Sequence, residues 1–464
     1  MDWDSIKIHI EELLRRTPAD YAEIRMEESE TTSFRFRGPK LETVGEGISV
    51  GGAIRVLSGR GWGFASFNSP GEIEERLARA TRLAELASPR RNRPVKLAPV
   101  DPVRQVFHPE ISSDPRDIPL ERKMRRFEDY NRRMLEAAEE ITSTQVVYGD
   151  RKTRLVFANN EGTLVDQVKL DIQGALVAMA TRGSDTQMGN AYFGSSTDYS
   201  VTAGLEEGID EAVRTAVALL DAPGVPGGRY TVIAAPPMAG VFAHEAFGHL
   251  SEADDLMENE RMRETMTLGR RFGPEHLNIF DTGDSPGSRG FLKYDDEGVP
   301  AKRADLIREG VLVGRLHSRQ SAATMGEEPT GSARALDHRF PPMCRMRNTQ
   351  IGAGDAELED LFAGVDRGLY VVSPYGGQTD DEMFTFMAGK AYLIEGGQPT
   401  ELVRDVTLTG NVFHTLTNID MIDREVGRDE SPGGCGKGEQ SPLPVGHWSP
   451  HIRIRDVTVG GGAR

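Results

Sequence analysis

The residues best suited to chemistry lie near the middle of the chain, in the segment Val241-Phe-Ala-His-Glu-Ala-Phe-Gly-His-Leu250. It holds two histidines, His244 and His249, with a carboxylate at Glu245 beside the first. Imidazole nitrogen is a favoured zinc ligand, and a glutamate next to such a ligand can take a proton from a water molecule activated by the metal. The segment therefore predicts a metal site with acid–base chemistry.

The spacing of the two histidines sets a structural condition on that site. The familiar zinc-protease helix has the pattern H-E-x-x-H, with histidines four residues apart on one face. Here the spacing is five, and on a regular α-helix five residues turn through about 500°, which leaves the two rings about 140° apart. A π-type bulge or a kink would bring the rings together, and Gly248 would ease such a distortion. We therefore expect a helix that is overwide or bent at Gly248.

The alternative is that one histidine packs in a core helix while the other lies on its surface. Apolar residues surround them in the segment, notably Val241, Phe242 and Phe247, so the segment belongs to a largely buried element. Buried glutamate and histidine side chains are costly without partners. The metal interpretation accounts for both histidines and the glutamate, and it is preferred.

Composition describes a globular chain with many turns. Its 464 residues are 38% apolar and 27% charged, with 51 glycines and 26 prolines, and this length favours two or three domains. The net charge of −17 argues against broad nucleic-acid binding, and the basic patch at residues 90–93 is interpreted as a solvated loop.

The same sequence favours a cytoplasmic location. No apolar run approaches the length of a membrane span, and the first residues, Met-Asp-Trp-Asp-Ser, lack the regions of a signal peptide. Cys344 and Cys435 are the only thiols, which excludes a disulfide framework and fits a reducing compartment. We expect neither a membrane nor a nucleic acid as a partner.

The first half, residues 1–224, is predicted to be an α+β domain with a mixed or antiparallel sheet. Expected helices cover about 4–16, 71–87, 120–141 and 205–220, with a proline-rich connector at 88–119. Short strands are expected at 21–26, 32–36, 41–44, 48–56, 61–65, 145–148, 153–157 and 163–180. Its only histidines are His9 and His108, so this half offers little metal chemistry.

A boundary is expected at residues 221–228, where two prolines and three glycines occur within eight residues. The second domain, residues 225–464, is predicted to be β-rich. It begins with a strand at 230–235, and Pro236-Pro237 then starts the helix that carries His244.

A zinc site needs a third protein ligand, and the residues downstream offer several. Cys435 is the most suggestive, because the run Pro432-Gly-Gly-Cys-Gly-Lys-Gly438 lets the backbone approach closely and Lys437 would favour the thiolate. Cys344 has no such setting and is interpreted as a buried residue. The remaining candidates are Glu252, Asp254, His276, His317, His338, His414, His447 and His451.

Further motifs make the chain resemble the TldD/PmbA (TldD/TldE) metallopeptidase family over nearly its whole length. These motifs are Gly61-Trp-Gly-Phe-Ala-Ser66, His244-Glu-Ala-Phe-Gly-His249 followed by Glu252, Tyr294-Asp-Asp-Glu-Gly298, Gly331-Ser-Ala-Arg334, Met346-Arg-Asn-Thr349, Gly376-Gly-Gln378, Phe384-Thr-Phe386, Ala391-Tyr-Leu-Ile-Glu395 and Cys435-Gly-Lys-Gly438. The sequence departs from the family pattern at Glu439, where glycine is expected, and at His447 and His451. These two histidines are either extra polar groups around the site or surface residues, and the second interpretation is preferred.

The resemblance implies zinc held by His244, His249 and Cys435, with Glu245 as general base. It implies a zinc metalloprotease that cleaves short or unfolded polypeptides with low sequence selectivity. The family pairs such a chain with a PmbA/TldE-like subunit that lacks the metal motif, so we expect a homodimer or that heterodimer. Two alternatives stay open: a non-catalytic zinc-bound scaffold or modulator, and a zinc hydrolase of a non-peptide bond.

Overall fold

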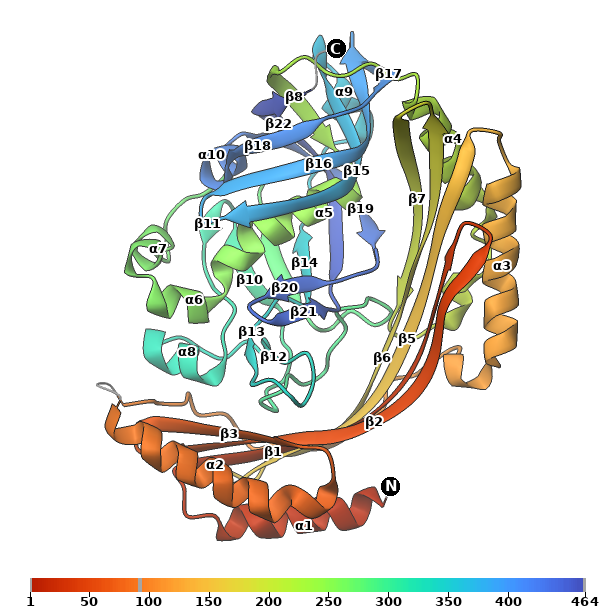
Figure 1. The fold of residues 1–464 in the computed structure, drawn as a ribbon. Coiled ribbons are helices and arrows are strands. Elements are labelled where there is room, and N and C mark those ends of the chain that lie inside the picture. The colour runs from red at the N-terminus through yellow and green to blue at the C-terminus, as the bar shows by residue number, and fades with distance from the viewer. Residues whose placement is uncertain (1, 91–93, 462–464) are drawn as a thin grey trace.

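The computed structural model describes residues 2–90 and 94–461, so most of the basic patch at 90–93 lies outside the described residues. Two large sheets, one from each half of the chain, dominate the molecule (Figure 1). Helices and strands are mixed as predicted, and the α+β class is confirmed. None of the helices in the described ranges is long and apolar enough to cross a membrane.

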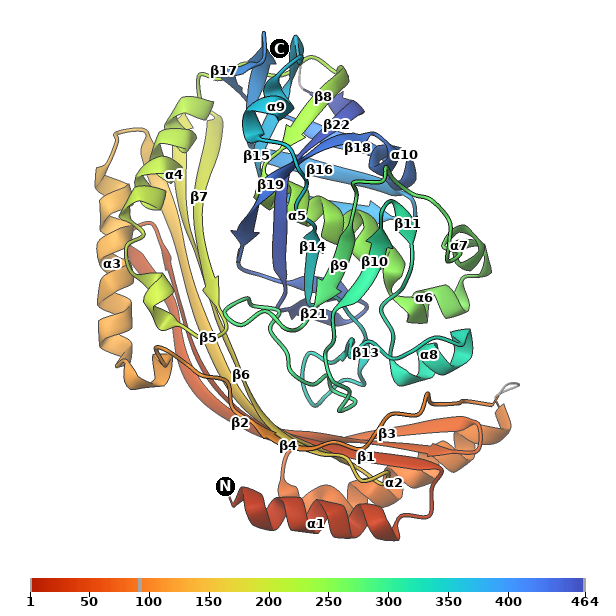
Figure 2. The same ribbon diagram turned by 180° about the vertical axis from the view of Figure 1, so that it is seen from behind.

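The first sheet has seven strands in the order β3-β2-β1-β5-β6-β4, with β7 paired to β6. It is strongly curved, and four helices cover its convex side (Figure 1, Figure 2). The strands are β1 (Tyr21–Arg37), β2 (Lys40–Ser58), β3 (Gly61–Phe67), β4 (Arg104–Phe107), β5 (Ile141–Asn159), β6 (Leu164–Arg182) and β7 (Asp185–Ser195). The helices are α1 (Trp3–Arg16), α2 (Ile73–Ala87), α3 (Leu120–Glu136) and α4 (Glu206–Leu219).

Strand lengths in this sheet correct the sequence prediction. The segments expected as separate strands at 21–26 and 32–36 are one strand, β1, and the same holds for the pairs that form β2 and β5. The helix expected to reach 141 ends at Glu136, β4 lies within the expected connector, and β7 was not predicted. In β1 and β5, polar residues between the expected fragments, notably Glu27, Ser29 and Asp150, are instead buried in the continuous strand, whereas residues 45–47 of β2 are exposed.

Those buried polar residues have partners that local sequence does not reveal. Ser29 on β1 hydrogen-bonds Thr153 on β5 at 2.8 Å, and Lys123 of α3 pairs with Asp150 at 2.8 Å. Glu27 accepts a hydrogen bond from the backbone N–H of His338, from the second half of the chain. Satisfied in this way, polar side chains are compatible with a buried strand.

The second sheet has eleven strands, and residues 228–460 supply all of them. They are β8 (Gly228–Ala234), β9 (Ile279–Thr282), β10 (Ala304–Arg308), β11 (Val311–Leu312), β14 (Asn348–Ile351), β15 (Arg367–Asp380), β16 (Met383–Glu395), β17 (Gln398–Val403), β18 (Thr407–Asn411), β19 (Ile419–Asp429) and β22 (Gly446–Gly460). Two small hairpins, β12 (Ala333–Arg334) with β13 (Met343–Cys344) and β20 (Cys435–Lys437) with β21 (Gln440–Leu443), lie beside it. The helices are α5 (Pro236–Ala243), α6 (Ala253–Glu258), α7 (Glu260–Thr265), α8 (Arg319–Met325), α9 (Leu358–Phe362) and α10 (Val412–Thr417).

The concave side of the first sheet faces the second half of the chain (Figure 1, Figure 2). Buried ion pairs join them, including Arg55 with Glu297 at 2.7 Å and Lys169 with Asp296 at 2.9 Å. The motif at 294–298 therefore ties the two halves together. Each sheet is formed from one side of the expected boundary at 221–228, and the division into domains at 224 stays a prediction.

Candidate metal centre

The helix that carries the two histidines widens where the sequence requires it. Helix α5 begins at Pro236, and a π-helical turn, His244–Gly248, follows it directly. The backbone N–H of His249 bonds to the carbonyl of His244, an i to i+5 bond that spans the two histidines themselves. Their ring centroids lie 5.3 Å apart. The predicted overwide helix is confirmed, and it brings both rings to one side.

Gly248 contributes in a different way from the one expected. Its φ is −58°, an ordinary helical value, so the glycine is not needed for backbone freedom. A Cβ at this position would lie 1.9 Å from the Sδ of Met346. The Met346 side chain therefore packs directly against Gly248, and a larger residue at this position would have to displace it.

Cys435 completes the set from 186 residues further along the chain. It begins the β20–β21 hairpin, and its Sγ lies 3.4 Å from Nε2 of His249. A Cβ on the preceding Gly434 would lie 2.3 Å from the carbonyl oxygen of Leu443, so the glycine lets the two hairpin strands close. The candidate ligand atoms of His244, His249 and Cys435 lie within 4.8 Å of one another. Among the described residues, this is the cluster of histidine, cysteine or acidic side chains that could hold a metal ion.

The chemistry of these three residues fits zinc. His244 is 2% exposed, and its Nδ1 is buried without a hydrogen-bond partner, although buried polar atoms are normally satisfied. Burial, reinforced by His447 and His249, holds the pKa of His244 well below its usual value, which keeps the ring neutral as a ligand must be. Two imidazoles and one thiol form a donor set that zinc prefers.

His249 is oriented by a buried carboxylate. Its Nδ1 lies 3.1 Å from Oε2 of Glu252, which leaves Nε2 facing Cys435. Burial alone would lower the pKa of His249, but without a metal Glu252 and Cys435 raise it to about 11, so a metal that binds Nε2 would have to displace a proton. Carboxylates of this kind fix the orientation of metal-binding histidines. Glu252 is thus an orienting partner of His249.

Lys437 lies in a cluster of carboxylates next to the candidate site. Its Nζ pairs with Asp254 at 2.7 Å, Asp255 at 3.0 Å and Glu252 at 3.1 Å. Three carboxylates therefore engage this ammonium group, and its effect on the Cys435 thiol stays a prediction. It neutralises the acidic residues behind His249.

Arg345 anchors the β20–β21 hairpin that carries Cys435, and the sequence analysis did not single it out. Its side chain is fully buried and donates to the carbonyl oxygens of Cys435 at 2.6 Å and Gln440 at 3.1 Å. These bonds join the first residues of β20 and β21 and fix where Cys435 presents its sulfur. Nothing in the local sequence marks this arginine, because its partners lie about ninety residues away.

Glu245 faces a cavity of about 470 Å³ together with His244 and Cys435. Burial raises the pKa of Glu245, which makes its carboxylate a better proton acceptor than a glutamate in water. One Glu245 oxygen lies 4.0 Å from Nε2 of His249. The carboxylate is therefore next to the metal-ligand group and open to the cavity.

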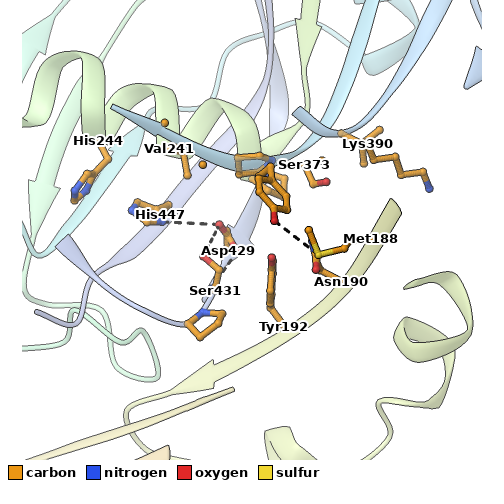
Figure 3. Close-up of a pocket in the computed structure, with 18 of the residues that line it drawn as sticks. Met188, Asn190, Tyr192, Val241, His244, Ser373, Lys390, Asp429, Ser431 and His447 are labelled. Carbon is orange, nitrogen blue, oxygen red and sulfur yellow. Dashed lines mark hydrogen bonds and ion pairs between the residues drawn. The ribbon is translucent and has the colours of Figure 1, made fainter. Parts of the chain in front are cut away.

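His447 lines the same cavity, and its interpretation as a surface residue is wrong. Its side chain is 13% exposed, its ring centroid lies 4.8 Å from that of His244, and its Nδ1 lies 3.8 Å from Asp429 (Figure 3). His451 is also partly buried, with Nδ1 3.1 Å from Asp423, and it is not among the residues that line the cavity. Glu439, by contrast, is exposed in the turn between β20 and β21.

The other candidate ligands lie elsewhere in other roles. His317 contacts Ser321 and Glu327, and His338 contacts Glu27 and Asn68. His276 contacts the carbonyl of Ile419, His414 contacts Asn418, and Asp254 contacts Lys437. Cys344 is buried, as expected.

Both halves of the chain supply the cavity walls. Strand β7 contributes Met188, Asn190 and Tyr192, opposite Ser373 of β15 and Lys390 of β16 (Figure 3). Tyr375 of β15 contacts Met188 across the cavity. Sequence analysis missed this wall, because β7 carries no residue of obvious chemical function. Only the packing of the two sheets makes it part of the site.

Comparison with known proteins gives consistent matches over the length of the chain. Residues 22–87 match PmbA/TldA metallopeptidase domain 1, residues 113–220 the central domain and residues 227–461 the C-terminal domain. A metalloprotease of Synechocystis sp. is 45% identical over 466 residues, which cover 100% of both chains. A zinc metalloprotease TldD homolog of Saccharolobus solfataricus is 39% identical over 237 residues, 50% of this chain and 52% of that one.

The crystal structure of TldE from Thermococcus kodakarensis has the same fold. It superposes with a TM-score of 0.75 at 18% sequence identity, and the match covers 99% of this chain and 100% of that one.

Proposed function

Because the chain belongs to the PmbA/TldD metallopeptidase family, we propose that it is a zinc-dependent peptidase that hydrolyses short or unfolded polypeptides with low sequence selectivity. The observation that carries this proposal is the position of Glu245, a buried carboxylate of raised pKa beside the ligand group in a cavity. In this proposal His244, His249 and Cys435 hold the zinc ion, and Glu245 is the catalytic residue.

When bound, zinc supplies Lewis acidity to the peptide carbonyl and the attacking water. Glu245 takes a proton from that water while the water oxygen attacks the carbonyl carbon. The carboxyl group of Glu245 then gives the proton to the amine nitrogen as the carbon–nitrogen bond breaks. Glu252 keeps the Nε2 of His249 directed at the metal position, and Arg345 keeps the Cys435 sulfur there.

The alternative of a closed, structural zinc site needs a fourth protein ligand. Of the candidates, Glu252 is engaged by His249 and Lys437, and His451 by Asp423. His447 lies beside His244 but is not part of the group whose ligand atoms converge. This arrangement supports a coordination position left for water or substrate, as in catalytic rather than structural zinc sites.

We propose that the substrate binds as an extended strand. The cavity lies between β7 and the segment of β15 after Val371, and in the described chain each of these pairs on one side only, with β6 and β16 respectively. Free strand edges hydrogen-bond a peptide backbone irrespective of its side chains. Cleavage of one protein in folded and denatured forms tests this: we expect only the denatured form to be cleaved.

The working state in this proposal is a dimer, either of two copies or with a TldE-like subunit, and its location is the cytoplasm. The fold likeness to TldE supports such a partner. Strand β2 also supports a partner chain. Its residues 40–49 are all exposed and pair only with β1 in the described structure. A long unpaired edge offers backbone groups with which another chain can pair. Light scattering of the purified chain, alone and with a TldE-like protein, tests this; a fully active monomer would contradict it.

The decisive experiment compares wild-type protein with Glu245→Gln by metal analysis and by mass spectrometry of peptide digests. The amide keeps the shape of the side chain but cannot accept the proton, so we expect full zinc content and a loss of cleavage by about a hundredfold or more. Activity within a few-fold of wild type would remove Glu245 from the mechanism and favour the scaffold. Hydrolysis of ester and non-peptide amide model substrates, measured in parallel, tests the alternative of a zinc hydrolase that acts on a non-peptide bond.

A further inference from the structure

The loop that precedes the candidate ligand Cys435, residues 430–434, is bound to the first half of the chain. It joins β19 to β20 on the side that faces β6 and β7 (Figure 1). The backbone N–H of Gly433 donates to the side-chain Oε1 of Gln173, on β6, at 2.7 Å. Gly433 has a φ of +92°, a conformation that glycine adopts readily, so this contact fixes a backbone segment that is otherwise easily deformed.

Arg289 holds the same loop from a second direction. Its guanidinium group donates to the carbonyl oxygens of Ser431 at 2.7 Å and Gly433 at 3.0 Å. The same group forms a bidentate ion pair with Asp171 of β6, at 2.8 and 3.0 Å. The side chain of Arg289 is fully buried, and bidentate pairing gives a guanidinium group a fixed orientation. Asp171 therefore orients Arg289, and Arg289 holds the loop.

Alternate residues of β6 face the second half of the chain. Gln167 donates to the carbonyl oxygen of Tyr294 at 3.0 Å. Asp171 and Gln173 lie further along the same face of the strand, because side chains two residues apart point the same way. The contact of Gln167 therefore lies at the motif that ties the two halves together, whereas the contacts of Asp171 and Gln173 lead to the loop before Cys435.

The position of the Cys435 sulfur depends on this loop. Gly433 is two residues before Cys435, and Arg345 donates to the carbonyl oxygen of Cys435 itself at 2.6 Å. Contacts from the first half and from the second half therefore fix the backbone on both sides of the Cys435 side chain. A loop that is already ordered does not lose backbone freedom when a metal binds, and this raises the affinity of the site.

We propose that Gln173 and Arg289, the latter oriented by Asp171, are positioning residues of the metal site, through which the first sheet sets its zinc affinity. This inference rests on the proposed function, in which Cys435 is a zinc ligand, and it gives the first half of the chain a part in metal binding. Because such coupling is reciprocal, zinc binding also strengthens the contact between the two halves to the same degree.

The first test measures zinc affinity by competition with a chromophoric chelator. Gln173→Leu removes the hydrogen-bond acceptor and nearly keeps the size of the side chain, so we expect the affinity to fall about tenfold or more. Gln173→Glu keeps an acceptor oxygen and should restore the affinity to within a few-fold of wild type. Gln167→Leu is the matched control, because it removes a bond of the same kind from the same face of β6, and it should keep the wild-type affinity. Unchanged affinity in Gln173→Leu, or an equal loss in Gln167→Leu, would overturn the inference.

The second test uses Co²⁺ in place of zinc, because a thiolate bound to Co²⁺ absorbs in the near ultraviolet and so reports the metal–sulfur bond directly. The absorbance per bound Co²⁺ should be lower in Gln173→Leu than in wild type and should return in Gln173→Glu. Asp171→Asn weakens the ion pair with Arg289 and should lower the absorbance in the same direction. A purely structural role of these residues would reduce stability and leave the absorbance of all three variants equal to that of wild type, which would contradict the positioning role.

Peptide cleavage separates this inference from the proposed function. A wild-type protein that shows the thiolate absorbance, with a lower absorbance in Gln173→Leu, but that cleaves no peptide would remove the peptidase and keep the positioning role. Cleavage that depends on Glu245, together with wild-type zinc affinity and absorbance in Gln173→Leu, would do the reverse.

Discussion

The two cysteines of this chain have nearly the same exposure and opposite surroundings. Cys344 is 0% exposed and Cys435 is 4% exposed. The Sγ of Cys435 faces Nε2 of His249 at 3.4 Å, whereas that of Cys344 accepts a hydrogen bond from the backbone N–H of Ser318 at 3.1 Å. Burial raises the pKa of the Cys344 thiol, which keeps it protonated. Burial therefore does not distinguish the two thiols, and only their neighbours do.

The contrast shows what places a thiol in a candidate metal site. Glycines before and after Cys435 let its loop close, Arg345 fixes its carbonyl, and the π-helical turn brings two imidazoles to it. Cys344 lies on β13 beside helix α8, where its neighbours are backbone and hydroxyl groups. A thiol in such surroundings packs as a small apolar residue.

The largest expected effect comes from removal of the ligand thiol. Cys435→Ala should lose most of its zinc and nearly all peptide cleavage, because two histidines alone do not form a zinc site. Metal analysis of the purified variant measures the loss. Cys344→Ala is the matched control and should keep one zinc per chain. Full zinc retention in Cys435→Ala, or zinc loss in Cys344→Ala, would break the distinction between the two thiols.

A smaller effect is expected from the carboxylate behind His249. Glu252→Gln keeps the shape but weakens the hydrogen bond to Nδ1, so zinc affinity should fall by about 10- to 100-fold. Competition with a zinc chelator measures the change. An affinity equal to that of wild type would show that the π-helical turn alone orients His249.

Thiol labelling sharpens the comparison without a mutation. In zinc-loaded protein neither cysteine should react quickly with a thiol reagent at pH 8, since one is a ligand and the other is buried with a raised pKa. After zinc removal one thiol per chain should react, and peptide mapping should place the label on Cys435. Rapid labelling of Cys344 would show that its surroundings open in solution.

The smallest expected effect is on stability. Cys344→Ala should lower the free energy of unfolding by about 1 kcal/mol, because it removes a buried sulfur and its hydrogen bond without charge or metal. Denaturant unfolding of zinc-loaded wild type and variant measures the difference. A loss of several kcal/mol would indicate that the contacts of α8 depend on this thiol.

Local sequence was sufficient for the parts of the protein that depend on neighbours in the chain. The five-residue spacing of His244 and His249 required a widened helix, because the geometry of a helical turn is a local property. The glycine run around Cys435 and the motifs shared with the family pointed to this cysteine as the third candidate ligand, and the structure places it beside the two histidines. The helices of the first half were also predictable, since apolar periodicity is read within one segment.

Tertiary structure alone decided what depends on distant contacts. The long strands β1 and β5 were predicted as fragments, because buried polar residues with partners far along the chain resemble turns. Strand β2 was divided at residues 45–47, two glycines and a glutamate that continue the strand by pairing with β1. Lys437 binds carboxylates from a distant segment of the chain, and His447 lies beside His244 rather than on the surface. Strand β7 becomes a wall of the cavity only because the concave sheet folds over the second half of the chain. Side-chain type and spacing carry no information about such contacts, which form when the two sheets pack.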